Sequence, residues 1–164
     1  MSFRILWPAM RWPDGREIES SSVGEHTAEF SERYQDVTQE QWESCDAIVT
    51  VNDVPDEYKK RLKNCRIVVT PKVGFDNIDL ESWSKLGIPV CNIPDYGTQE
   101  VADHAMALML SLMKGITFHT RELKKDPSGL WSPALNPFGK RLSKCVFGIV
   151  GLGRIGTAAA LRAK

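Results

Sequence analysis

The sequence predicts an α/β protein, in which a parallel sheet carries helices on both faces. Short β-branched runs alternate with polar helical patterns along the chain, an alternation typical of βαβ units. The hydrophobic fraction of 42% is enough for a core in a chain of 164 residues. An apolar run at residues 146–150 leads into closely spaced glycines, the pattern of a strand, a tight turn and a helix.

Strands are expected wherever a short apolar run is rich in β-branched residues. These runs cover residues 3–7, 47–51, 67–70, 89–93 and 146–150, and a further strand is expected near residues 27–30. Polar, periodic segments between them predict helices at residues 39–43, 56–63 and 80–86. Pro55 suits a helix start and Gly87 a helix end.

Short polar side chains precede the third of these helices. Asp76 and Asp79 could suggest paired-carboxylate chemistry, but Asn77 and Asp79 flank a helix start, where such residues satisfy free backbone N–H groups. Capping is therefore the interpretation that we favour.

A longer helix is predicted over residues 101–113, with Thr98 as its N-cap. It is apolar on nearly all sides, which predicts burial between layers or domains. Its methionines would suit a ligand groove, but a helix core is favoured. Residues 126–144 are rich in Pro, Gly, Asn and Ser and predict a connecting loop. The expected organisation is a first domain at 1–97, a helix and loop at 98–144, and the start of a second domain at 145–164.

Composition excludes several functional classes. The formal net charge is zero and cationic clusters are short, which argues against nucleic-acid binding. No apolar run reaches the roughly 18 residues of a membrane span, and no secretory leader is visible, so a cytoplasmic location is expected. The four cysteines are widely spaced and are expected to be reduced and buried, with no metal site.

The glycine pattern 151–156 predicts a dinucleotide-binding turn. Gly151 would permit the tight turn, Gly153 would let a pyrophosphate approach the backbone, and Gly156 would let helix and strand pack closely. An ordinary strand–helix turn is the alternative. An acidic residue ~20 positions further on would complete the pattern. The sequence ends at Lys164, so only the first strand and part of the first helix of this domain are expected.

Several motifs together resemble the family of D-isomer-specific 2-hydroxy acid dehydrogenases. The resemblance extends from Ala47 to Lys164 and is poor before that. It rests on the residue ranges 73–80, 86–94, 96–104, 129–131 and 148–156, which occur in the family's order. It implies a flavodoxin-like substrate domain with a parallel sheet, followed by a Rossmann domain.

The resemblance also implies site residues. Backbone N–H groups of Val73 and Gly74 would hold the substrate carboxylate. Lys72 replaces a residue that is often small, and it could add charge to anion binding or point into solvent. Val101 would pack near the nicotinamide. The pyrophosphate loop would comprise Gly151, Gly153, Arg154, Ile155 and Gly156.

The family's catalytic arginine, glutamate and histidine match nothing in this chain, so no catalytic residue is assigned. The implied parent is an NAD-dependent oxidoreductase that interconverts small 2-hydroxy and 2-oxo acids, with NADP not excluded. It is expected to be a homodimer. The chain alone is expected to be inactive and prone to self-association. The alternatives are an NAD-binding corepressor-like protein or a non-catalytic binding domain.

Overall fold

The structure is a computed structural model that describes residues 2–10, 16–127 and 140–164. The chain forms two compact units, Met1–Asp95 and Tyr96–Lys164. The motif at 129–131 and most of the predicted loop at 126–144 lie outside the described residues.

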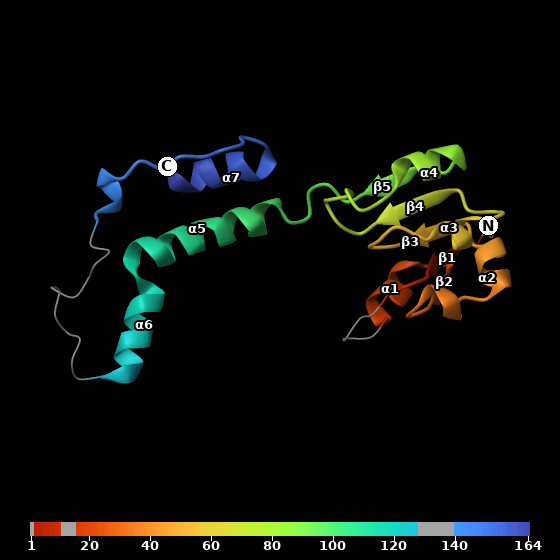
Figure 1. Cartoon of the computed structure of the whole chain (residues 1–164), viewed down its shortest axis with the longest axis horizontal. Helices are drawn as coiled ribbons and strands as arrows, with labels where there is room; N and C mark the ends of the chain where they lie inside the picture. Colours follow the sequence, from red (N-terminus) through yellow and green to blue (C-terminus); the bar gives the residue numbers. More distant parts are fainter. Residues whose placement is uncertain (1, 11–15, 128–139) are drawn as a thin grey trace. The chain divides into compact units, whose positions relative to one another are not determined.

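The first unit contains a five-stranded sheet in the order β2-β1-β3-β4-β5, and every pair of neighbours is parallel (Figure 1). The strands are β1 (Arg4–Trp7), β2 (Thr27–Phe30), β3 (Ala47–Val49), β4 (Ile67–Thr70) and β5 (Val90–Asn92). These elements confirm the predicted α/β class. The strand order reverses between β1 and β3, and ligands bind α/β sheets at the carboxyl ends of strands beside such a reversal.

Among the described residues of this unit, four helices and a short 3-10 turn connect the strands. They are α1 (Glu17–Ser22), η1 (Tyr34–Asp36), α2 (Gln39–Ser44), α3 (Asp56–Lys59) and α4 (Leu80–Lys85). The prediction was right for α2 and α4 within one or two residues. It was too long for α3, because Arg61 and Leu62 donate to carbonyls three residues back and the chain continues as turns. It missed α1, which buries no residue and so has no apolar face to recognise.

The core of the first unit joins the sheet to its helices. Trp42 of α2 and Trp83 of α4 are fully buried, together with Ile48 of β3 and Val68 of β4. Aromatic side chains of this size bury 150–250 Å² each and dominate core energetics. The helices are thereby fixed against the central strands, and the loops that follow these strands are held in place.

The second unit is helical in its described part. Its helices are α5 (Thr98–Lys114), α6 (Ile116–Lys125) and α7 (Arg154–Ala163), with a 3-10 turn η3 (Leu142–Lys144). Gly115 separates α5 from α6 in the left-handed conformation, with φ of 62°, which favours glycine. The prediction of Thr98 as N-cap was wrong: Thr98 is the first helical residue, and Gly97 precedes it without a side-chain cap.

Burial in the second unit is slight. Ala102 of α5 packs against Ala158 and Ala159 of α7 and is the one buried residue of α5. Leu112 is 72% exposed. The expected burial of α5 is therefore not found in the described residues, because its apolar side chains beyond Ala102 are only partly covered or exposed.

The strand predicted at residues 146–150 is not formed. Val146 and Val150 are fully exposed, and within the described residues this segment pairs with no other strand. A strand requires a neighbour to satisfy its backbone groups, so this apolar run forms no strand without one. The apolar pattern of residues 146–150 indicates a tendency to form a strand, but the strand forms only where a neighbouring strand is present.

The cysteines divide into two kinds. Cys45 is buried and Cys65 half-buried, whereas Cys91 and Cys145 are exposed, which corrects the expectation that all four are buried. Cys91 lies in the edge strand β5, and Cys145 precedes the unpaired segment. The Cys45 thiol donates a hydrogen bond to Cys65, and this bond, followed by burial, raises the pKa of Cys45. The same hydrogen bond lowers the pKa of Cys65.

The described residues contain neither a membrane-spanning helix nor a cluster of metal-binding side chains. No helix among them is long and apolar enough to cross a membrane. No group of three or more His, Cys, Asp or Glu side chains among them is arranged to hold a metal ion.

Candidate functional site

The loop between β4 and α4, residues 71–79, contains the predicted substrate-binding residues. It is fastened to the end of β5 by two hydrogen bonds. The backbone N–H of Ile93 donates to the Lys72 carbonyl at 3.2 Å, and the side-chain Nδ2 of Asn92 donates to the Val73 carbonyl at 2.8 Å. The carbonyls of Lys72 and Val73 thus accept hydrogen bonds from the end of β5 and from the residue after it.

The N–H groups of the same loop are available. Val73 and Gly74 are exposed, and neither N–H donates to an acceptor within the described part of the chain. Consecutive N–H groups in a turn form a concave site for an anion. The loop therefore presents two backbone N–H donors, and hydrogen bonds at the end of β5 fix its position.

Lys72 does not simply point into solvent, one of the two alternatives that its sequence position left open. It is half-buried, and its Nζ donates to Asn77 Oδ1. Asn77 Nδ2 in turn donates to Asn52 Oδ1 at 2.8 Å and to the Val51 carbonyl at 3.1 Å. Asn77 therefore connects the ammonium of Lys72 to the loop after β3.

A buried lysine, Lys59, stabilises the loop after β3. Lys59 is 3% exposed, and its Nζ lies 2.8 Å from Asp53 Oδ2 and also donates to Ser82 Oγ. Trp83 Nε1 donates to the other oxygen of Asp53 at 2.8 Å. Buried charges are tolerated when they are paired and hydrogen-bonded, and this group meets that condition. It fixes Asp53, the neighbour of Asn52.

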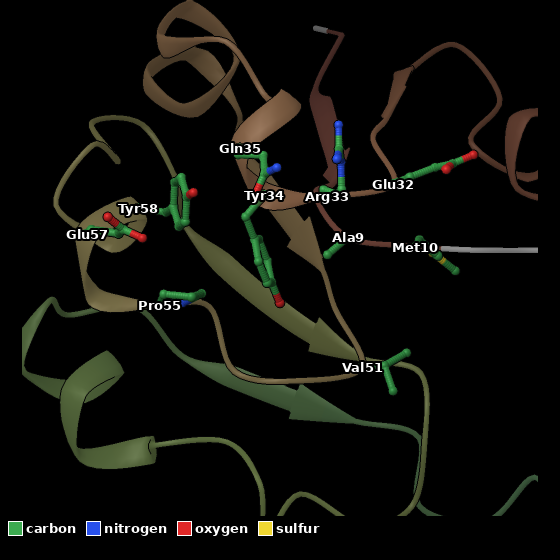
Figure 2. A pocket seen from close by; sticks show the side chains of 10 residues that line it. All are labelled: Ala9, Met10, Glu32, Arg33, Tyr34, Gln35, Val51, Pro55, Glu57 and Tyr58. Atoms are coloured by element: carbon green, nitrogen blue, oxygen red, sulfur yellow. The ribbon is translucent and has the colours of Figure 1, made fainter.

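A pocket of about 700 Å³ opens at the carboxyl ends of β1 and β3. Its wall includes Met10, Tyr34, Val51 and Tyr58, and Figure 2 shows the Tyr34 ring projecting across it while Arg33 points the other way. Tyr34 donates from its hydroxyl to the Asp53 carbonyl at 3.2 Å. Since Val51 also accepts from Asn77, the pocket adjoins the Lys72 network.

The glycine turn of the second unit has two positions at which the backbone favours glycine. Gly151 has φ of 90°, where side chains are disfavoured. A Cβ on Gly156 would stand 2.1 Å from the Gly151 carbonyl oxygen, whereas one on Gly153 would meet nothing within 4 Å. Gly153 precedes α7 without a side-chain cap. The start of α7 therefore has open space at Gly153, and a helix N-terminus with such space suits a phosphate.

The other predicted cofactor-binding residues lie in the same unit. Arg154 and Ile155 form the start of α7, and Val101 lies on α5, next to the buried Ala102. Arg162 of α7 reinforces the packing of these helices, because it bonds to Asp103 and, at 2.7 Å, to Gln99 of α5. The structure thus joins the helix of Val101 to the helix of the glycine turn. The substrate-binding residues belong to the other unit.

The asparagines Asn52, Asn77 and Asn92 were not recognised from the sequence as parts of the site. Asn77 was interpreted as a helix-start residue. Asp79 does cap α4, accepting from the Ser82 N–H at 3.1 Å, but Asn77 holds Lys72 instead. The signal was present: Asn52 and Asn92 stand at or just beyond strand ends, and the carboxyl ends of parallel strands meet at one edge of a sheet.

The chain is similar in sequence to proteins of one enzyme family. Residues 14–161 match the family described as D-isomer specific 2-hydroxyacid dehydrogenase, catalytic domain. A glyoxylate reductase of Pyrococcus furiosus is 40% identical over 125 residues, which is 73% of this chain and 37% of the relative. A glyoxylate/hydroxypyruvate reductase of Arabidopsis thaliana is 41% identical over 103 residues, covering 63% of this chain and 32% of the relative. The matched part of the chain thus spans about a third of the length of these relatives.

Solved structures show the same fold. An NADPH-dependent glyoxylate/hydroxypyruvate reductase from Sinorhizobium meliloti, in complex with citrate, superposes with a TM-score of 0.78 at 27% identity. The match covers 99% of this chain and 50% of that one. D-lactate dehydrogenase from Aquifex aeolicus gives a TM-score of 0.76 at 22% identity, over 98% of this chain and 47% of that one.

Proposed function

Because this chain belongs to the D-isomer-specific 2-hydroxyacid dehydrogenase family, we propose that it serves the interconversion of a small 2-hydroxy acid and the matching 2-oxo acid. The observation that carries this proposal is the pair of exposed N–H groups at Val73 and Gly74 on a loop fixed by β5. These groups would donate to the substrate carboxylate. Hydrogen bonds to a charged acceptor contribute about 1.5–3 kcal/mol each.

The second unit would bind a nicotinamide dinucleotide, which supplies or accepts a hydride when bound. Its pyrophosphate would lie at the uncapped start of α7, where Gly153 leaves room. Val101 would line the nicotinamide side. The remaining residues proposed for the pyrophosphate are Gly151, Arg154, Ile155 and Gly156. We favour NAD, as the sequence resemblance implies, and the NADPH-dependent relative makes NADP the alternative.

The test is a turnover assay of the protein produced from its native gene. We expect consumption of NADH, or of NADPH, with glyoxylate or hydroxypyruvate as the oxidant. Val73→Pro, which removes one N–H, should lower kcat/KM at least about tenfold, whereas Val73→Ala keeps the N–H and should change it little. Absence of turnover with either cofactor and every small 2-oxo acid would refute the proposal.

The 164-residue chain by itself is a second sample for the same assay. No residue in it matches the family's catalytic arginine, glutamate or histidine, so we expect no turnover. Measurable reduction of glyoxylate by this chain would show that the acid/base is one of the residues present here.

A corepressor-like role is the second candidate. A protein named C-terminal-binding protein 1 from Caenorhabditis elegans is 32% identical over 108 residues, covering 64% of this chain and 15% of that protein. Turnover of a 2-oxo acid separates the two candidates, since the second requires none. The homodimer and the cytoplasmic location expected from the sequence stay predictions.

A further inference from the structure

Lys72 is held by hydrogen bonds at its backbone and at the end of its side chain. Its backbone carbonyl is bound by Ile93 of the segment after β5, and its Nζ is bound by Asn77. Asn77 is itself fixed by Asn52 and by the Val51 carbonyl. A lysine side chain ordinarily has ~2 kcal/mol of rotamer entropy, so a tether at the Nζ atom indicates a defined position for the charge.

The charge of Lys72 is not neutralised inside the protein. Within the described residues its Nζ forms no ion pair with any carboxylate, and its partner Asn77 is a neutral amide. An ammonium has three N–H donors, and the amide oxygen occupies one. Lys59, by contrast, is paired with Asp53 at 2.8 Å. Lys72 therefore has donors available to an anion from outside.

The Lys72 ammonium is directed towards a different part of the site from the backbone N–H groups of Val73 and Gly74. Asn77 holds Nζ on the side of the loop that faces β3, through Val51 and Asn52. The Asp76 carboxylate lies near Gly74, since a Cβ on Gly74 would stand 3.6 Å from Asp76 Oδ2. Negative charge beside Gly74 and positive charge towards Val51 favour a ligand whose second anionic group extends towards the β3 side.

We propose that Lys72, positioned by Asn77, selects 2-oxo acids that carry a second carboxylate. This inference rests on the proposed function, since it assumes that Val73 and Gly74 bind the carboxylate beside the oxo group. The second carboxylate would pair with Lys72 Nζ, next to the pocket wall formed by Val51. Lys72 is then a specificity-determining residue, and Asn77 is a positioning residue.

The experiment is an NMR titration of the ¹⁵N-labelled 164-residue chain, in which the amide resonances of Val73 and Gly74 are followed. The ligands are two pairs matched in length: oxaloacetate with 2-oxobutyrate, and 2-oxoglutarate with 2-oxopentanoate. We expect at least one dicarboxylate to bind about tenfold more tightly than its matched monocarboxylate, as for one added charged contact.

Three variants test the role of Lys72. Lys72→Met should reduce the tenfold ratio to about twofold or less and weaken monocarboxylate binding only slightly, while Lys72→Arg should keep most of the ratio. Asn77→Asp keeps an acceptor oxygen but adds a charge that neutralises Lys72, so the ratio should fall. Lys60→Met, on an exposed lysine of the same unit, is the matched control and should leave the ratio unchanged.

The outcomes separate this inference from the proposed function. If both ligand classes shift the Val73 and Gly74 resonances with equal affinity, the carboxylate loop stands and the role of Lys72 is wrong. If the ratio persists in Lys72→Met, another group selects the second carboxylate. If no ligand shifts these resonances, the loop is not the carboxylate site and both proposals fail.

Discussion

At the scale of single residues, two carboxylates contact the buried ammonium of Lys59, and we expect their contributions to stability to differ widely. Asp53 is 27% exposed, lies 2.8 Å from Nζ and also accepts from Trp83. Asp56 is 76% exposed and lies 3.4 Å away. Removing one partner of a buried pair leaves the other charge without compensation, whereas an exposed pair contributes little.

Asp53→Asn should therefore lower the free energy of unfolding by about 2–3 kcal/mol, somewhat less than for a fully buried pair because Asp53 is partly exposed. Asp56→Asn, the matched control on the same lysine, should lower it by at most about 0.5 kcal/mol. Urea denaturation followed by tryptophan fluorescence measures both. Equal effects of the two substitutions would mean that Lys59 is not held mainly by Asp53.

Gly156 illustrates a close approach that excludes a side chain. In an ordinary helix position, Gly→Ala stabilises by about 0.5–1 kcal/mol. At Gly156 the new Cβ would stand 2.1 Å from the Gly151 carbonyl oxygen, so the turn must shift. Gly156→Ala should instead destabilise the second unit by about 1–3 kcal/mol, as overpacking does.

Gly153→Ala is the control for this substitution, because its Cβ would meet nothing within 4 Å. Amide hydrogen exchange of α7, compared between the two variants, measures the difference. Equal protection in both would show that the contact between Gly156 and Gly151 can relax freely.

The residue scale also shows what sequence reasoning can reach. The glycine positions were predictable, since a backbone requirement allows few residue types and leaves a fixed spacing. The tether of Lys72 was not, because Asn77 and Asn52 are 25 residues apart in sequence and meet only when β3 and β4 pair. A polar contact of this kind leaves no periodic signal.

At the scale of elements, the prediction succeeded where an element carries its own determinants. β4 was predicted with its observed bounds, because its four β-branched residues form a central strand. Residues 146–150 carry a similar apolar pattern and form no strand, because a strand also depends on a neighbour. α1 was missed because nothing on it is buried. An apolar sequence pattern therefore predicts a tendency to form an element, and packing against neighbours determines whether the element forms.

The pairing of β3 with β4 makes a prediction about thiol chemistry. Ala47 pairs with Ile67, so the same register brings Cys45 close to Cys65. The hydrogen bond with Cys65 and burial raise the pKa of Cys45, and the thiolate is the reactive form. Iodoacetamide at neutral pH should modify Cys91 and Cys145 first and Cys45 last, as mass spectrometry of the labelled peptides will show. Rapid labelling of Cys45 in the folded chain would contradict the arrangement.

The same shift has a defined sign for stability. The raised pKa of Cys45 means that the folded chain keeps this proton when an unfolded thiol loses its own near pH ~8.5. The unfolded state then binds fewer protons, so this thiol's contribution to stability is present below pH ~8.5 and falls as the pH rises. The lowered pKa of Cys65 acts in the opposite direction. Cys45→Ala should therefore reduce the loss of stability between about pH 8.5 and 10, measured by urea denaturation. An unchanged pH profile in this variant would contradict the assignment.

At the scale of the whole molecule, the two units differ in how much apolar surface they bury. The first unit has a core around Trp42 and Trp83, whereas the buried cluster of the second consists of three alanines. Leu112 and Leu161 of the second unit are more than two-thirds exposed. Exposed apolar surface of this kind favours association.

The isolated 164-residue chain should consequently self-associate as its concentration rises. Leu112→Lys should shift the onset of association to higher concentration, measured by light scattering. Ile18→Lys, at a similarly exposed position of the first unit, adds the same charge and should have a smaller effect. Equal effects of the two substitutions would show that net charge, and not the surface of α5, controls association.

The strand order also determines when each strand can pair during synthesis on the ribosome. β1 is made first but lies inside the sheet, between β2 and β3. It cannot complete its pairing until residue 49 has been made, and the core around β4 must wait for residue 70. At roughly 5–20 residues per second, the interval from β1 to β4 is on the order of 3–12 s. During that time an apolar first strand is exposed to whatever else the nascent chain encounters, so slower translation of this segment would increase its dependence on chaperones.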